Sequence, residues 1–314
     1  MSEDCIHAVL IEPQLERFRR LCGLEDVALA TSFEGWHRHA ILAPDRVFLF
    51  PRHQSNVRGL RREVAVLTAL EGRGVPAARL LGHWHDREVS PYPFIAVSRL
   101  PGRTWSQLEA SATLDQLATM MESLGRAVAT WHRLERRSLP RHIPRRRNEV
   151  EQALATTMGP AAYDVARRLQ LPRERATAWL RALEPLAAMP PALVHGDVNE
   201  GQILVDEQRR VTGILDWEAA HVGHPLKDFD FGEWGYGIFA WDRHFDLLRR
   251  RLWQGYAAVR GGTLPGWQAL HLFYSLSWAH YFGNRPTLDA WGRARLDTTL
   301  QHLRHLEAQD EVPS

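Results

Sequence analysis

The sequence LVHGDVNEGQILVDEQRRVTGILDWEAAHVG, residues 193–223, decides how the rest of the chain is interpreted. Its apolar runs are rich in β-branched residues and are separated by turn residues, which predicts a strand, a tight turn and two further strands. Asp197 follows the first of these strands and Asp216 follows the last. We therefore expect the two carboxylates to lie at the mouths of neighbouring strands, aimed at a common point.

Two carboxylates in this arrangement suit phosphoryl transfer. One accepts the proton of the attacking hydroxyl, and the other holds the magnesium ion of a nucleoside triphosphate. An amide residue, Gln202, stands five positions after Asp197, where a further metal-binding oxygen is useful. An isolated His-Gly-Asp sequence is more often chance or a structural turn. Together with the amide, the following strand and Asp216, however, it is typical of a kinase.

The segments His195-Gly196-Asp197 and Leu215-Asp216-Trp217-Glu218 resemble the aminoglycoside phosphotransferase family, which carries H-G-D-x-x-x-x-N followed by I-D-W-E or a similar sequence. Gln202 departs from this pattern because the family has asparagine there. The resemblance implies that Asp197 is the catalytic base and that Gln202 and Asp216 bind magnesium. It also implies that His195 supports this site from behind.

The segment from Gly223 to Asp228, GHPLKD, is similar to the family's G-x-P-x-x-D, in which the aspartate buttresses the active-site loop. The resemblance implies an α+β, protein-kinase-like fold with two lobes. Residues 1–98 would form a small antiparallel-sheet lobe that covers the nucleotide, and residues 99–314 a mainly helical catalytic and acceptor-binding lobe. The implied cofactors are ATP or GTP and Mg²⁺.

Composition limits the other classes of function. The 314 residues carry a formal net charge of only +2, which gives no general basic field for nucleic acid. The amino terminus opens with acids and lacks a signal-peptide core, and no window approaches eighteen uninterrupted apolar residues. The two cysteines, Cys5 and Cys22, cannot form a disulfide framework. We expect a cytoplasmic protein with reduced thiols, no membrane span and no nucleic-acid partner.

The first hundred residues predict a five-stranded antiparallel sheet with two helices. The helices are expected at residues 13–22 and 55–70, and the strands at residues 27–29, 40–42, 47–50, 79–84 and 94–98. Gly35 lies in the first turn, where a kinase-like lobe covers the triphosphate with backbone N–H groups. An ordinary hairpin would also use a glycine there.

The third strand conflicts with the family pattern, which places a lysine or arginine two residues before a Pro-Arg pair. Leu49 occupies that position and cannot neutralise phosphate charge. We expect Arg52 or Arg58 to supply the cation instead. Arg52 is the nearer candidate, with Pro51 bending the strand so that Arg52 swings inward. Glu63 stands where the family's partner glutamate would lie, although a solvated helix face explains it nearly as well.

Residues 96–102, AVSRLPG, resemble the family's hinge between the lobes. Adenine is typically recognised there by main-chain groups. The resemblance implies that Ser98 offers its carbonyl and Leu100 its N–H, while Val97 shapes the back of the pocket. A plain linker remains the alternative.

The remainder of the chain reads as helical. A helix capped by Thr113 and running to residue 135 is expected at the centre of the second lobe, followed by a solvated, arginine-rich connection over residues 133–147. Further helices are expected within residues 149–188 and over residues 242–259, 264–281 and 287–306. Acids among aromatics at Asp230, Glu233 and Trp234 suit a cationic or ring-bearing acceptor, or equally a solvent-facing helix.

Two functions follow from these observations. The first is a kinase that transfers the γ-phosphate of ATP or GTP to a hydroxyl of an antibiotic-like or other small molecule. The second is a catalytically inactive pseudokinase that only binds a nucleotide or ligand, which Leu49 and Gln202 favour and the paired aspartates oppose. The sequence does not identify the acceptor.

Overall fold

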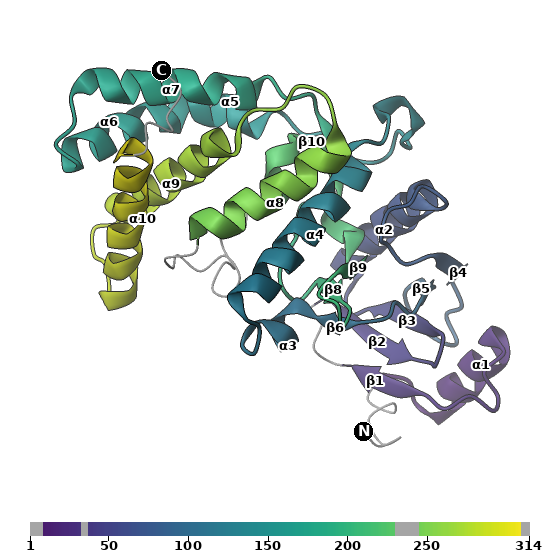
Figure 1. Ribbon diagram of the computed structural model, residues 1–314. Helices are drawn as coiled ribbons and strands as arrows, with labels where there is room; N and C mark the ends of the chain where they lie inside the picture. The colour runs from purple at the N-terminus through teal and green to yellow at the C-terminus, as the bar shows by residue number, and fades with distance from the viewer. Residues whose placement is uncertain (1–8, 33–36, 230–244, 309–314) are drawn as a thin grey trace.

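The computed structural model describes residues 9–32, 37–229 and 245–308. Figure 1 shows a sheet with two helices at one end of the molecule and a larger group of helices at the other. The sheet is antiparallel, has five strands and runs in the order β1-β2-β3-β5-β4. Its strands are β1 (Ala30–Ser32), β2 (Arg38–Leu42), β3 (Arg46–Pro51), β4 (Leu80–Trp84) and β5 (Phe94–Ser98).

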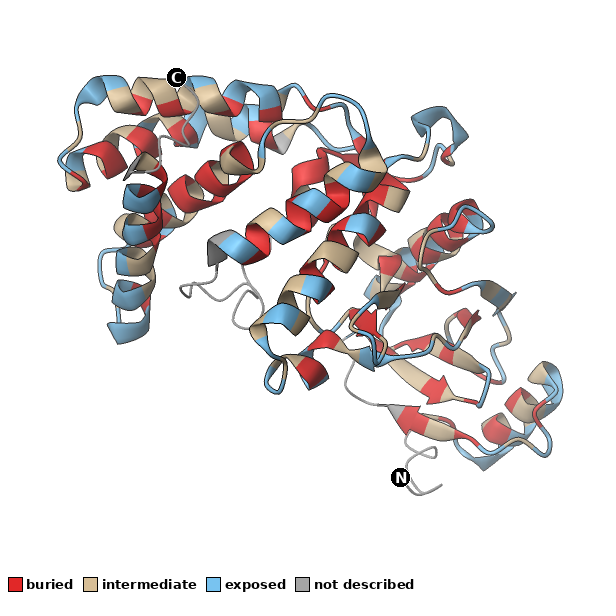
Figure 2. Cartoon of the chain, in the orientation of Figure 1, coloured by how far each residue is buried: buried red, intermediate tan, exposed pale blue. Residues whose placement is uncertain are grey.

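The sheet separates two cores because its side chains alternate between two faces. One face carries Ile41, Phe48 and Phe50 and packs with Phe18 of α1 (Glu12–Cys22) into a small core. The other face carries Ile95 and Val97 and joins α2 (Val57–Leu70) and the helical lobe in a larger core. Figure 2 shows the buried residues continuing from the sheet into the helices.

The helical lobe is built on α4 (Leu114–His132), which packs against α8 (Phe245–Arg260). The two helices cross at glycines: a Cβ atom at Gly125 would overlap the carbonyl oxygen of Leu252, and one at Gly255 would overlap that of Glu122. The remaining helices are α3 (Trp105–Glu109), α5 (Glu149–Ala153), α6 (Gly159–Arg168), α7 (Arg173–Ala187), α9 (Trp267–Gly283) and α10 (Ala290–Ala308). None of the described helices is long and apolar enough to cross a lipid bilayer.

Two small sheets carry the loops of the predicted site. One pairs β7 (Ala192–Val194) with β10 (His221–Gly223), and the other has the order β6-β8-β9, with β6 (Arg103–Thr104), β8 (Ile203–Val205) and β9 (Val211–Ile214). Along the chain, the last strand of the large sheet, β5, ends at Ser98, and the next strand, β6, pairs with β8. The lobe boundary expected between residues 98 and 99 stays a prediction.

Most predicted elements are confirmed, including the five-stranded sheet and the helix capped by Thr113, whose hydroxyl accepts the N–H of Gln116 at 3.3 Å. The strand predicted over residues 27–29 is wrong, because the first strand begins at Ala30. Leu29 is nevertheless buried in the core beneath α1, so its apolar character reflects packing and not strand pairing.

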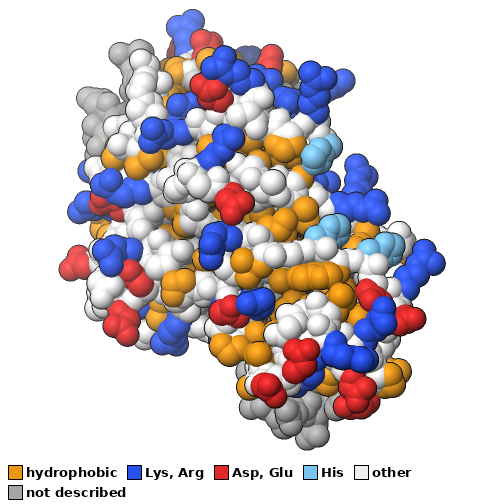
Figure 3. All heavy atoms as spheres, turned by 90° about the vertical axis from the view of Figure 1, so that its right-hand side faces the viewer, with side chains coloured by type: hydrophobic (Ala, Val, Ile, Leu, Met, Phe, Trp, Pro, Cys, Tyr) orange, Lys and Arg blue, Asp and Glu red, His pale blue; other side chains and the backbone are white. Residues whose placement is uncertain are grey.

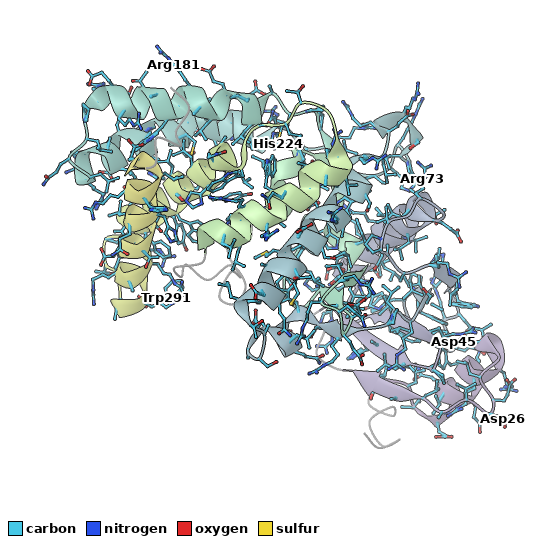
Figure 4. The ribbon with its side chains drawn as sticks, viewed as in Figure 1. Asp26, Asp45, Arg73, Arg181, His224 and Trp291 are labelled. Carbon is cyan, nitrogen blue, oxygen red and sulfur yellow. The ribbon has the colours of Figure 1, made fainter. Side chains whose placement is uncertain are left out.

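His224 is buried within the helical lobe, as Figure 4 shows. Its Nε2 donates to the carbonyl of Leu186 at 2.9 Å, and its Nδ1 accepts the N–H of Leu226 at 3.2 Å, so the ring is held in its neutral form. Burial lowers the pKa of His224 to about 4, because its effect outweighs that of the hydrogen bond to Leu186, which raises the pKa.

This lowered pKa predicts a specific acid sensitivity. Between pH 6.5 and about 4 the unfolded chain binds a proton at His224 and the folded chain does not, so the free energy of unfolding falls as the pH falls. The full loss is on the order of 3 kcal/mol at about 1.4 kcal/mol per pKa unit. Urea unfolding at pH 7 and pH 4.5 should therefore show a smaller loss for His224→Gln than for the wild type.

The exposed His142 offers the control, and His142→Gln should keep the wild-type dependence on pH. An equal loss of unfolding free energy in the wild type and in His224→Gln would contradict the assignment.

Candidate active site

The turn after β7 is held by His195, whose side chain is buried. His195 Nε2 donates to the carbonyl of Leu215 at 2.8 Å, and His195 Nδ1 accepts the N–H of Asp197 at 3.3 Å, which fixes one neutral tautomer. Leu215 directly precedes Asp216. The strands that precede the two aspartates are not hydrogen-bonded to each other, because β7 pairs with β10 and β9 with β8. The imidazole, not a strand pair, joins the loops of the two aspartates.

Asp228 lies behind this turn as a buried carboxylate with four donors. Its Oδ1 accepts the N–H of Gly196 at 2.8 Å. Its Oδ2 accepts the N–H of His195 at 2.9 Å, the indole N–H of Trp131 at 2.7 Å and a contact from His132 Nε2 at 3.0 Å. Burial alone would raise the pKa of Asp228, but these hydrogen bonds and the nearby histidines lower it. Asp228 therefore fixes the backbone immediately before Asp197 and is charged at neutral pH.

Asp197 is half-buried and is oriented by a residue that the sequence analysis did not select. The amide nitrogen of Asn199 lies 3.3 Å from Asp197 Oδ1, and the amide oxygen of Asn199 accepts the N–H of Gly201 at 3.0 Å. A short polar side chain two residues after an aspartate commonly bonds to the local backbone, and this signal was available in the sequence. Asp197 is thus held from both its backbone and its carboxylate.

Asp216 has left-handed backbone dihedrals, φ 63° and ψ 67°. This region is sparsely populated by residues other than glycine and is found where a site requires it. Asp216 Oδ2 accepts the amide of Gln202 at 3.3 Å, so the two predicted metal ligands lie together. One carboxylate and one amide are a donor set that fits Mg²⁺, which takes few protein ligands and completes its shell with water and phosphate oxygens.

A cluster of charges that the sequence analysis missed surrounds Asp216. Arg38 of β2 donates from Nη1 to Glu63 of α2, and from Nη2 to Asp216 Oδ1 at 2.8 Å and Glu218 Oε2 at 2.6 Å. His37 contacts the other oxygen of Glu218. We call Arg38, Glu63, Asp216 and Glu218 the carboxylate cluster, in which three acids share one guanidinium. The surplus of negative charge favours a cation beside it.

The pKa values of two acids in the carboxylate cluster are shifted in different directions. Burial raises the pKa of Glu63, and the charge of Asp216 adds to this effect against the opposing charge of Arg38. For Glu218, burial acts in the same direction, but Arg38 and His37 outweigh it and lower the pKa. The three carboxylates raise the pKa of Arg38 against its burial, so the guanidinium stays charged. Glu63 is thus paired and buried, not a solvated residue.

Arg52 does not join this cluster. Burial and then the charge of Arg52 lower the pKa of His39, which places Arg52 near the sheet face that packs against α1. The expected bend at Pro51 is wrong: Pro51 pairs with Arg38, and the N–H of Arg52 donates to the carbonyl of His37 at 3.0 Å. The ladder therefore continues through the proline.

The expected hinge residues lie where the large sheet meets the helical lobe. Val97 is buried in the larger core, Ser98 ends β5, and Leu100 packs closely over Gly213 of β9. Thr212 Oγ1 donates to the carbonyl of Pro101 at 2.7 Å, which ties this segment to the β8–β9 hairpin. The part of these residues in nucleotide binding stays a prediction.

Four expected site residues, Gly35, Asp230, Glu233 and Trp234, lie outside the described residues. Within the described ranges, the structure adds one acid near the predicted base: burial, and then the charge of Asp197, raise the pKa of Glu200. Glu200 therefore lies close enough to Asp197 for their charges to interact.

The chain is similar in sequence to known phosphotransferases. The sequence profile of the phosphotransferase enzyme family matches residues 31–273. Viomycin phosphotransferase from Streptomyces vinaceus is 28% identical over 230 residues, which are 70% of this chain and 77% of that protein.

Two solved structures show the same fold. The GDP complex of wild-type aminoglycoside 2'-phosphotransferase-IIIa superposes with a TM-score of 0.56 at 18% identity, covering 95% of this chain and 99% of that one. Macrolide 2'-phosphotransferase MphH from Brachybacterium faecium superposes with a TM-score of 0.52 at 23% identity, covering 90% and 98%. The predicted two-lobe, kinase-like fold is confirmed.

Proposed function

Because this chain belongs to the phosphotransferase enzyme family, whose members transfer phosphate to hydroxyl groups, we propose that it is a magnesium-dependent kinase of a small hydroxylated acceptor. The observation that carries this proposal is the linkage through His195 of two loops, one ending in Asp197 and the other in Asp216. Asp197 accepts the proton of the acceptor hydroxyl. Asp216 and Gln202 hold the magnesium ion, which neutralises charge on the phosphates when it is bound.

The proposed donor is ATP or GTP, and the solved relatives bind both kinds of nucleotide: one is a complex with GDP and another is ADP-bound. The proposed acceptor is an antibiotic-like molecule, as the names of the viomycin, aminoglycoside and macrolide phosphotransferases suggest. Asp197 and Glu200 support a cationic acceptor through their adjacent negative charges. We place the reaction in the cytoplasm, where the nucleotide is available.

The pseudokinase alternative gains no support from the structure. The pseudokinase hypothesis rested on Leu49 and Gln202, yet Gln202 lies beside Asp216 and a guanidinium reaches Glu63 from another strand. On the face that Figure 3 shows, Asp and Glu side chains lie among the Lys and Arg side chains. This mixture of charges, with a formal net charge of +2, supports a small-molecule acceptor over nucleic acid.

The test of this function is phosphate transfer from ATP and from GTP, each with Mg²⁺, to a panel of aminoglycosides, macrolides, viomycin-like peptides and small hydroxylated amines. Product is detected by the mass of the added phosphate. We expect one acceptor class to be phosphorylated. Nucleotide binding without transfer to any member of the panel, together with unchanged binding in Asp216→Asn, would contradict a kinase built on these aspartates.

Asp216→Asn is expected to remove most of the gain in nucleotide affinity that Mg²⁺ provides, because it removes the charged metal ligand. Asparagine is the chosen substitute because it tolerates the left-handed dihedrals of this position. Calorimetric titration with and without Mg²⁺ measures the gain. Asp206→Asn, in the turn between β8 and β9, is the control and should keep it. Full retention of the gain in Asp216→Asn would show that Asp216 is not a metal ligand.

A further inference from the structure

The carboxylate cluster raises a question that the proposed function leaves open, namely which residue binds the triphosphate where Leu49 is apolar. Leu49 is partly buried against the larger core and pairs in register with Ala40 of β2. Arg38 lies two residues from Ala40 on the same strand, so it projects from the same face of the sheet as Leu49. Diagonal neighbours on one face lie about 7–8 Å apart, within reach of a long side chain.

The acidic partner of Arg38 is Glu63. Glu63 is buried on α2, and Arg38 Nη1 donates to it. Without Arg38, the carboxylate of Glu63 would be buried with no cation among the described residues. The glutamate expected to pair with a cation on β3 therefore pairs with one on β2.

The guanidinium of Arg38 reaches the open part of the site beside Asp216, whose side chain is 33% exposed. Its Nη2 donates to Asp216 and to Glu218, so a phosphate oxygen bound there takes the place of one of these two acceptors. Its buried Nε has no hydrogen-bond partner in the part of the chain that the structure describes. A planar guanidinium presents several donors in a fixed fork that matches phosphate oxygens.

We propose that Arg38 of β2 is the residue that binds the phosphate oxygens of the nucleoside triphosphate, in place of a cation on β3. Glu63 holds one side of the guanidinium while the Nη2 edge, beside Asp216, faces the phosphates. This assignment rests on the proposed function, and it replaces the expectation for Arg52.

The experiment measures binding of ATP, GTP, adenosine and guanosine by calorimetry, with Mg²⁺ present, and uses the base that the wild type binds. Arg38→Met should weaken triphosphate binding by about tenfold or more, the range of one charge-assisted hydrogen bond. Nucleoside binding should change by less than threefold, because the base does not contact Arg38. Arg38→Lys should retain only part of the triphosphate affinity, because lysine keeps the charge but not the fork of donors.

A cation introduced at position 49 provides a second test. Leu49→Lys should restore triphosphate binding in the Arg38→Met background to within about threefold of the wild type, since both positions share one face of the sheet. If Arg38→Met does not fold because Glu63 is left unpaired, the double variant Arg38→Met/Glu63→Gln removes both charges and carries the same expectations.

The outcomes are separable from those of the proposed function. A wild-type protein that binds neither triphosphate overturns the proposed function itself. A wild-type protein that binds one of them, with equal losses for nucleoside and triphosphate in Arg38→Met, overturns only the assignment of Arg38. A selective loss of triphosphate binding in Arg52→Met, with none in Arg38→Met, does so as well and returns the role to Arg52.

Discussion

Asp197→Asn is expected to lower the rate of phosphate transfer by about 100- to 10,000-fold, the usual contribution of a general base. The amide keeps the shape of the carboxylate but cannot accept the proton of the acceptor hydroxyl. The surrounding turn should persist, because His195, Gly196 and Asp228 hold it through backbone and side-chain bonds that the substitution does not remove.

Single-turnover transfer to the acceptor found in the panel measures this loss, and titration with nucleotide shows whether the site is otherwise intact. We expect nucleotide affinity to change by less than threefold. Asp206→Asn is the matched control, because it exchanges the same groups in a turn away from the site and should keep the wild-type rate. A rate for Asp197→Asn within threefold of the wild type would rule out Asp197 as the base.

Periodic patterns account for the part of the fold that the sequence predicted well. The helices α2 and α4 and the strands β2 and β3 carry apolar residues at regular spacing because each buries one face, or two alternating faces, against a core. The strand expected over residues 27–29 failed for a physical reason as well, since Leu29 is buried beneath α1 without pairing. The strand β10 was missed because it has only three residues, one of them His221, which is too short for an alternating apolar pattern to be recognised.

The residues of the site also fall into two groups, those that the sequence pattern showed and those that it did not. Asp197, Gln202, Asp216 and Asp228 are close enough in sequence for their spacing to show them. Arg38 is 178 positions from Asp216, and its role depends on the register between β2 and β3. The sequence showed that Leu49 leaves a cation missing, but only strand pairing shows which neighbouring side chain lies on the same face. Contacts between elements far apart in the sequence could therefore not be predicted from sequence patterns.

Asp228→Asn is expected to lower the free energy of unfolding by about 3–5 kcal/mol, the cost of breaking a buried charged network from one side. The carboxylate accepts from four donors, and an amide must direct its own N–H groups at one or more of them. Asp115→Asn, at an exposed position in the first turn of α4, is the control and should cost less than about 1 kcal/mol. Urea unfolding at pH 7 measures both values.

The pH dependence identifies the charge as the cause. The pKa of Asp228 is lowered in the folded chain, so its stabilisation is present above the unfolded value of 3.8 and is lost as the pH falls through the folded value. The difference in unfolding free energy between wild type and Asp228→Asn should therefore be constant from pH 7 to about pH 5 and shrink below pH 4. A cost under 1 kcal/mol at pH 7, or a difference that grows as the pH falls, would mean that Asp228 does not hold the turn before Asp197 by its charge.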